Sequence, residues 1–198
     1  MKKYIGLIIL VLFIDQFSKI YIKTHFRMNE VYQITNWFQL HFVENPGMAW
    51  GFEFGGKTGK LILSVFRIAA LFFIGNWLRT AVKNNSHFLL QTAVALIFAG
   101  ALGNILDSVF YGLIFNAPIH GLAHFVPFGT GYETVLHGRV VDMLDFPIWS
   151  GNLPNWIPFY GGKYFKFFNA IFNVADFAIS VGVGILIVFS KRIFPKEV

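Results

Sequence analysis

The chain contains no cysteine and few charged residues. The absence of cysteine excludes a disulfide framework, a thiolate nucleophile and a Cys-ligated metal site. Only 13% of the 198 residues are charged, whereas an average soluble domain has about 25%. Apolar residues are abundant instead, at 56% of the chain. This composition predicts a membrane protein.

Four apolar segments are long enough to cross a hydrocarbon core of roughly 30 Å. They cover about 4–22, 61–78, 88–106 and 168–189. The first has the basic start and apolar core of a signal peptide, but no small-x-small cleavage site follows it, so we expect a retained span. The sequence therefore predicts an all-α membrane protein, with residues 1–198 forming a single domain of four transmembrane helices.

Lysine and arginine predict the orientation of these helices. Basic residues are densest in the two short ends and in the short loop between the second and third segments. By the positive-inside rule both termini should be cytoplasmic, and the connections at about 23–60 and 107–167 should be extracytoplasmic. Because the basic residues flank apolar segments, the net charge of +6 does not indicate a nucleic-acid partner.

The two extracytoplasmic connections have different patterns. Residues 31–54 partly alternate apolar and polar side chains, which predicts short strands with a turn at "ENPGMAWG". The second connection is rich in glycine, proline and aromatic residues, including Trp149 and Trp156. Aromatic side chains suit the headgroup level of a membrane. We therefore hypothesise that the stretch at about 147–166 lies on the outer membrane face.

Polar residues interrupt the apolar helices at similar expected depths. Asp15 and Lys19 are four residues apart on one helix face, and we interpret them as an ion pair that stabilises packing. Asn104 and Asn173 fit either a hydrogen bond between helices or a substrate contact, and both alternatives stay open. Asp107 ends its helix, and we favour a structural role for it.

Asp142 and Asp176 have no obvious basic partner beside them in the sequence. Because an unpaired buried carboxylate is costly, we favour a functional role for both. If the two approach each other they share one proton. One carboxylate then takes a proton from water while the other polarises a carbonyl group, which is aspartic-peptidase chemistry.

Five motifs occur in order along the chain: "DQFSK", "ENPGMAWGF", "GALGNILD", "GRVVDMLDF" and "FNVADFAIS". Together they resemble the lipoprotein signal peptidases (signal peptidase II), a family of four-helix membrane aspartic peptidases of bacteria. The resemblance implies Asp142, in preference to Asp145, and Asp176 as the catalytic pair. It also implies substrate contacts at Asn45, Gly103, Asn104 and Asn173.

The resemblance further implies the reaction and the setting. The substrate would be a prolipoprotein carrying diacylglycerol on its lipobox cysteine, cut on the N-terminal side of that cysteine without a metal or cofactor. The protein would be a monomer among the lipids of the bacterial cytoplasmic (inner) membrane. A cyclic peptide of the globomycin type would inhibit it.

The chain also departs from the family pattern. Ser108 stands where the family usually has an arginine, and Arg139 or Lys19 is our candidate to replace it in holding the substrate. Met48, Ala49 and Trp50 alter the second motif. The segments at about 109–137 and 147–166 are insertions.

Other function classes fit less well. Ser18 and Lys19 are adjacent, so their side chains do not face each other as a serine–lysine pair would require. His120 and His124 lack the glutamate of a zinc peptidase motif. A proton-coupled transporter is disfavoured because the chain has no inverted repeat. A non-catalytic scaffold for lipidated proteins remains open, and it would tolerate Asp142→Asn.

Overall fold

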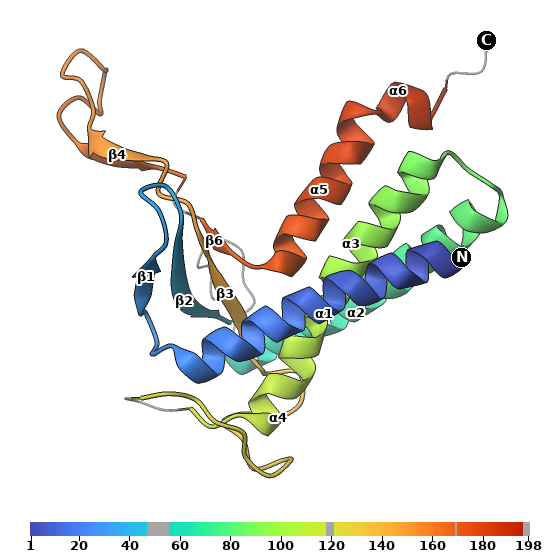
Figure 1. The fold of residues 1–198 in the computed structure, drawn as a ribbon, viewed down its shortest axis with the longest axis horizontal. Helices are drawn as coiled ribbons and strands as arrows, with labels where there is room; N and C mark the ends of the chain where they lie inside the picture. The colour runs from blue at the N-terminus through green and yellow to red at the C-terminus, as the bar shows by residue number, and fades with distance from the viewer. Residues whose placement is uncertain (47–55, 118–120, 169, 196–198) are drawn as a thin grey trace.

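A bundle of apolar helices meets a small β-sheet region at one end (Figure 1). The computed structural model describes residues 1–46, 56–117, 121–168 and 170–195. The main helices are α1 (Lys2–His25), α2 (Gly56–Lys83), α3 (Phe88–Leu106) and α5 (Val174–Val188), followed by the short α6 (Ser190–Ile193). The start of α1 and the short α6 lie at the end of the bundle away from the sheet. We call the two ends the sheet end and the terminal end.

Among the described residues, three helical segments are long and apolar enough to cross a membrane: α1, α2 and the stretch Phe88–Ile114. That stretch joins α3 to a π-helical turn, η2 (Asp107–Tyr111), and to α4 (Gly112–Ile114). α3 has the predicted bounds, whereas α1 and α2 extend beyond their predicted ends at both termini. The outer faces of these helices expose apolar side chains, as a lipid-facing surface requires. On α2, for example, Phe66, Phe72 and Phe73 are about 70% exposed.

The predicted start of the fourth helix, at about residue 168, is wrong. α5 begins only at Val174, and β6 (Ile171–Phe172) precedes it. The cause is local, because the side chain of Asn173 accepts a hydrogen bond from the backbone of Asp176 and caps the helix there. Asp176 therefore lies in the first turn of α5, at the end of the helix.

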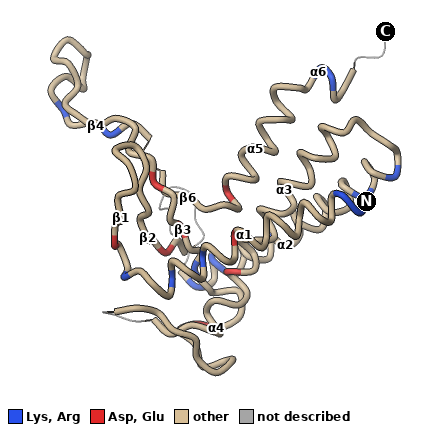
Figure 2. Tube along the Cα trace, in the orientation of Figure 1, with Lys and Arg blue, Asp and Glu red and all other residues tan. Residues whose placement is uncertain are grey.

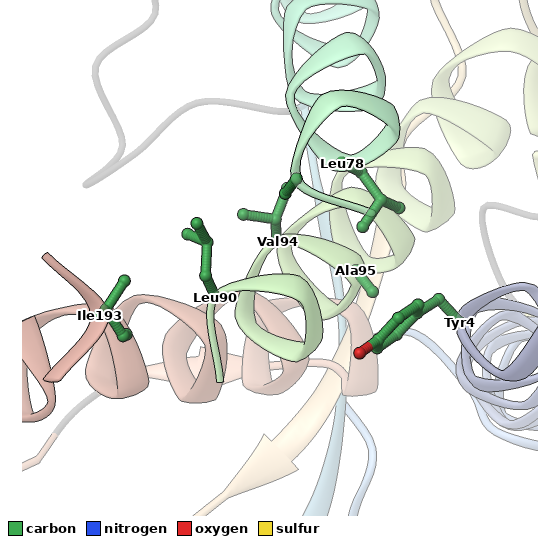
Figure 3. Close-up of a cluster of buried hydrophobic side chains, with 7 residues drawn as sticks. Tyr4, Leu78, Leu90, Val94, Ala95 and Ile193 are labelled. Atoms are coloured by element: carbon green, nitrogen blue, oxygen red, sulfur yellow. The ribbon is translucent and has the colours of Figure 1, made fainter. Parts of the chain in front are cut away.

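α3 packs most closely against α5, through small residues. A Cβ added at Gly100 would lie 2.2 Å from the carbonyl oxygen of Ala175, and one added at Gly182 would lie 2.7 Å from that of Ala93. Small residues on both helices thus let the two backbones approach closely. At the terminal end, Tyr4 of α1, Leu78 of α2, Val94 of α3 and Ile193 of α6 belong to one buried apolar cluster (Figure 3).

Four antiparallel strands form the sheet, in the order β1-β2-β3-β6. The strands expected within residues 31–54 are present as β1 (Val31–Gln33) and β2 (Gln39–Asn45). Residues 47–50 of the expected turn lie outside the described residues. β3 (Val140–Asp145) was not predicted, because its burial on both faces gives no polar–apolar alternation.

A second, two-stranded sheet occupies the insertion at about 147–166. β4 (Trp149–Asn152) pairs with β5 (Tyr164–Phe167), and this hairpin projects from the sheet region (Figure 1). Trp156 and Phe159, in the connection between the two strands, are 80% and 91% exposed. The stretch at about 147–166, predicted as an insertion, thus forms an exposed hairpin arm.

Candidate active site

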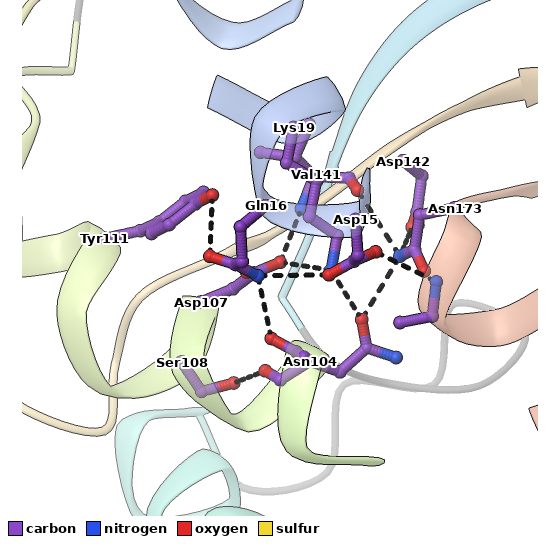
Figure 4. Close-up of polar contacts among 12 residues, drawn as sticks. Asp15, Gln16, Lys19, Asn104, Asp107, Ser108, Tyr111, Val141, Asp142 and Asn173 are labelled. Carbon is purple, nitrogen blue, oxygen red and sulfur yellow. Dashed lines mark hydrogen bonds and ion pairs between the residues drawn. The ribbon is translucent and has the colours of Figure 1, made fainter. Parts of the chain in front are cut away.

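Charged residues are sparse along the helices and gather where the bundle meets the sheet (Figure 2). At this junction, polar side chains from α1, α3, η2, β3 and α5 converge (Figure 4). Segments far apart in the sequence thus build one connected polar network within an otherwise apolar bundle.

Lys19 is the cation at the centre of the network. Its Nζ lies 2.9 Å from Asp15 Oδ2 and 2.8 Å from Asp107 Oδ2, and all three side chains are almost fully buried. The same Nζ donates a hydrogen bond to Asn104 Oδ1 at 2.9 Å. The expected Asp15–Lys19 pair is therefore present, and Asp107 joins it. Lys19 is enclosed by these partners, so its cost of burial is offset by two carboxylates.

Gln16 completes this part of the network, and the sequence reasoning missed it. Its Nε2 donates to Asp15 Oδ2 at 3.0 Å and to Asp107 Oδ1 at 2.9 Å, and its Oε1 accepts from the Tyr111 hydroxyl at 3.2 Å. The available signal was a polar residue next to Asp15 in an apolar helix.

The start of α5 is fixed by several hydrogen bonds. Asn173 and Asp176 form a capping box, in which the Asn173 Oδ1 accepts from the Asp176 N–H at 2.9 Å and the Asp176 carboxylate accepts from the Asn173 N–H at 3.4 Å. Asp15 Oδ1 accepts from the Ala175 N–H at 2.8 Å. Helix α1 therefore positions the turn that carries Asp176.

Two amide side chains connect Asp142 of β3 to Asp176 of α5. Asn173 Nδ2 donates to Asp142 Oδ1 at 2.7 Å, and Asn104 Nδ2 donates to Asp176 Oδ1 at 2.8 Å. The two amides are joined to each other, since Asn173 Nδ2 also lies 3.2 Å from Asn104 Oδ1. Asn45 of β2 also hydrogen-bonds Asp142.

The environment of each aspartate differs. Asp142 is 4% exposed, and burial first, then the neighbouring Asp176 carboxylate, raise the pKa of Asp142 to about 7. Asp176 lies in the first turn of α5, where backbone N–H groups and the helix dipole favour a carboxylate. Asp142 can therefore hold a proton near neutral pH.

Asp145 differs from Asp142, although both lie on β3. Asp145 Oδ2 accepts from Gln39 Nε2 at 2.5 Å and lies 3.7 Å from Lys166 Nζ and 3.6 Å from His41 Nδ1. Asp145 therefore belongs to a separate polar group on the sheet.

The other predicted residues have their own surroundings. A Cβ added at Gly103 would lie 2.7 Å from Asp15 Oδ2, so this glycine permits the contact between α1 and α3. Arg139 Nη1 lies 3.1 Å from Glu44 Oε2, and its guanidinium stacks over Tyr132. Ser108 is buried and donates to the Asn104 carbonyl at 3.1 Å. A substrate-binding role for Arg139 stays a prediction.

Within the described ranges, no three or more His, Asp and Glu side chains are grouped to hold a metal ion. His120, of the histidine pair considered above, lies outside those ranges. The helical bundle with its amide-bridged aspartate pair defines the class of the protein as a membrane peptidase of the aspartic type.

Comparisons with known proteins agree with this class. The model of the family described as Signal peptidase (SPase) II matches residues 7–192, and the chain belongs to that family. A lipoprotein signal peptidase of Porphyromonas gingivalis is 47% identical over 192 residues, covering 96% of this chain and 84% of that protein. One of Amoebophilus asiaticus is 39% identical, covering 96% and 78%.

The fold also matches solved structures. A bacterial membrane enzyme solved by the in meso method at 1.9 Å resolution aligns with a TM-score of 0.61 and 23% identity, covering 100% of this chain and 96% of that one. A second such structure, at 2.3 Å resolution, gives a TM-score of 0.60 and 24% identity. At these identities the likeness concerns the fold alone.

Proposed function

We propose that the chain removes the signal peptide from diacylglyceryl-modified prolipoproteins by cutting on the N-terminal side of the lipidated cysteine. The observation that carries this proposal is the amide-bridged pair Asp142 and Asp176 at the sheet end of the bundle. Membership of the signal peptidase II family supports the same reaction.

The two aspartates divide the chemistry between them. Asp142, with its pKa raised to about 7, holds the shared proton and donates it toward the oxygen of the scissile carbonyl. Asp176, the carboxylate at the start of α5, takes a proton from the attacking water. When the C–N bond breaks, Asp176 gives the proton that it took from water to the leaving nitrogen. Asp142 takes a proton back from a hydroxyl of the tetrahedral intermediate, which becomes the new carboxyl group, and the pair returns to its singly protonated state.

Neighbouring residues support this pair in two ways. Asn104 and Asn173 orient the carboxylates through their amide donors, while Asn45 and Arg139 contact the substrate peptide. Gly103 lets α1 and α3 approach closely enough for the site to form. Asp15, Lys19 and Asp107 form the structural ion group beneath it. This division is supported by the short hydrogen bonds of the two amides and by the burial of the ion group.

We infer that the chain is one membrane domain over residues 1–198, with four spans, in the bacterial cytoplasmic (inner) membrane. The fourth span comprises α5 and α6 together. Both termini are cytoplasmic, and the connections at about 23–60 and 107–167 are extracytoplasmic. The inference is supported by the start of α1 and the helix α6, which lie at the same end of the bundle, where lysine and arginine recur (Figure 2).

The exposed hairpin arm, β4 to β5, lies on the outer membrane face in this arrangement. Its bare aromatic side chains and its lysines Lys163 and Lys166 match the composition of a membrane interface. Brominated lipids should quench Trp156 fluorescence in a variant that keeps Trp156 as its sole tryptophan. If Trp156 fluoresces equally in vesicles with and without brominated lipids, the arm does not contact the membrane.

Cleavage by purified protein tests the proposed reaction. Wild type should release the signal peptide from a diacylglyceryl-modified prolipoprotein, whereas Asp142→Asn and Asp176→Asn should not. Asp145→Asn is a matched control, because Asp145 is also buried on β3 but belongs to a separate polar group. If folded wild type binds the substrate and leaves it intact, the scaffold alternative is correct. Inhibition by a globomycin-type cyclic peptide and a monomeric mass in detergent are further expectations.

A further inference from the structure

One face of α2 carries a row of polar side chains. Lys60, Ser64 and Arg67 recur every three or four residues, so they share a helix face. Lys60 Nζ donates to the His137 carbonyl at 2.6 Å, and Ser64 Oγ donates to the Leu136 carbonyl at 3.0 Å. This face is therefore turned toward the segment that leads into β3 and Asp142.

Arg67 is the deepest member of this row. It is the twelfth residue of α2, which places it roughly 16 Å along the helix from Gly56. An arginine near the middle of a membrane span is costly unless it faces the interior of the bundle or a partner. Arg67 is half-buried, and its charge interacts with both Asp176 and Asp142. Its guanidinium therefore lies on the side of α2 that faces the aspartate pair.

The charges at the junction show what such a cation would do. Asp15 and Asp107 share the single cation Lys19. Asp142 and Asp176 add one further negative charge when they share a proton. Lys19 alone leaves this group of four carboxyl groups two negative charges in excess, in a region of low dielectric. A second cation next to the pair reduces that excess to one.

We propose that Arg67 is a positioning residue for the cleavage reaction, and that its guanidinium is the counter-charge that stabilises the singly ionised Asp142–Asp176 pair. The inference rests on the proposed function of that pair. A cation from α2 balances the pair from a different helix.

Several other charged groups surround the pair and must stay constant in a test. They are Asp15, Lys19 and Lys23 of α1, Glu44 of β2, Lys60 of α2, Asp107 of η2, and Arg139 beside β3. Lys23 and Arg139 both pair with Glu44, and Lys60 is bonded to a backbone carbonyl. The test variants therefore change position 67 alone.

The test compares Arg67→Gln and Arg67→Lys with Arg79→Gln, which changes an exposed arginine about three turns further along the same helix. Removing a cation makes ionisation of the pair less favourable, so the pH at which kcat/KM falls on the alkaline side should rise by about one pH unit in Arg67→Gln. KM should change by less than about twofold. Arg67→Lys should restore the wild-type profile, and Arg79→Gln should match wild type. An unchanged pH profile, with or without a higher KM, would overturn the proposal.

A second readout separates this inference from the proposed function. If wild type cleaves no prolipoprotein, the proposed function fails, but the counter-charge remains testable by thermal unfolding. Ionisation of buried Asp142 lowers the melting temperature as pH rises, and Arg67→Gln should move that decline to higher pH. Introducing Arg67→Gln into the double variant Asp142→Asn, Asp176→Asn should produce no such shift. An equal decline in wild type and Arg67→Gln would refute the counter-charge.

Discussion

Gly100 offers the sharpest test of how the bundle positions the site. A Cβ at this position would lie 2.2 Å from the Ala175 carbonyl oxygen, which is backbone and cannot rotate away. An ordinary C···O contact needs about 3.3 Å, so Gly100→Ala should push α5 away from α3 by about 1 Å. The hydrogen bond between Asn104 Nδ2 and Asp176 Oδ1, now 2.8 Å long, would then be broken.

The expected losses follow from that displacement. Overpacking of this kind costs about 1–3 kcal/mol of stability, and a 1 Å misplacement of a catalytic group costs about 10²-fold in rate. The assay is kcat for prolipoprotein cleavage, together with the melting temperature. Gly184→Ala is the matched control, because nothing lies within 4 Å of a Cβ added at Gly184 on α5. If Gly100→Ala cleaves at the wild-type rate, the close α3–α5 contact does not position Asp176.

Three further predictions concern the polar network. The pKa of Asp142 is raised from 3.8 to about 7, so the folded state binds this proton more tightly than the unfolded state does. The folded state therefore loses up to about 4 kcal/mol of stability as the pH rises from about 4 to about 7. Asp142→Asn should thus melt above wild type at pH 8 and close to it at pH 4, and equal melting at pH 8 would contradict the raised pKa. Gln16→Leu should lower the free energy of unfolding by about 1–3 kcal/mol, because the buried Tyr111 hydroxyl and Asp107 each lose a hydrogen-bond partner. Gln33→Leu, on the exposed strand β1, should change it little. Equal losses of stability in the two variants would argue against the network. Asn173→Asp keeps the N-cap acceptor but removes the amide donor that lies 2.7 Å from Asp142. The variant should therefore keep its helix content, measured by circular dichroism, and lose cleavage. Full cleavage would exclude Asn173 from the site.

Much of the fold could be predicted because membrane helices are local features. The bounds of α3 and the existence of α1 and α2 follow from apolar runs of sufficient length. The start of α5 could not be predicted from hydropathy, because the residues before it are just as apolar. The capping box of Asn173 and Asp176 decides where that helix begins. That same cap explains how Asp176 is accommodated: it lies where backbone donors favour a carboxylate.

The candidate site was partly predictable for a different reason. Asp142 and Asp176 were found because carboxylates in apolar surroundings are costly and therefore conspicuous. Their amide bridge, and the sharing of Lys19 between Asp15 and Asp107, depend on contacts between residues far apart in sequence. β3 was missed because burial on both faces removes the alternation that identifies a strand. The relation of Arg67 to the pair could not be predicted, because it depends on how α2 is placed against β3 and α5.

The pH dependence of kcat/KM for wild-type cleavage of a diacylglyceryl-modified prolipoprotein tests the central claim most directly. The claim is that Asp142 and Asp176 share one proton and that Asp142 must hold it to polarise the scissile carbonyl. Because the pKa of Asp142 is raised to about 7, kcat/KM should fall above about pH 7, approaching tenfold for each further pH unit. A value of kcat/KM that stays constant from pH 6 to pH 9, in protein that remains folded throughout, would contradict the shared proton.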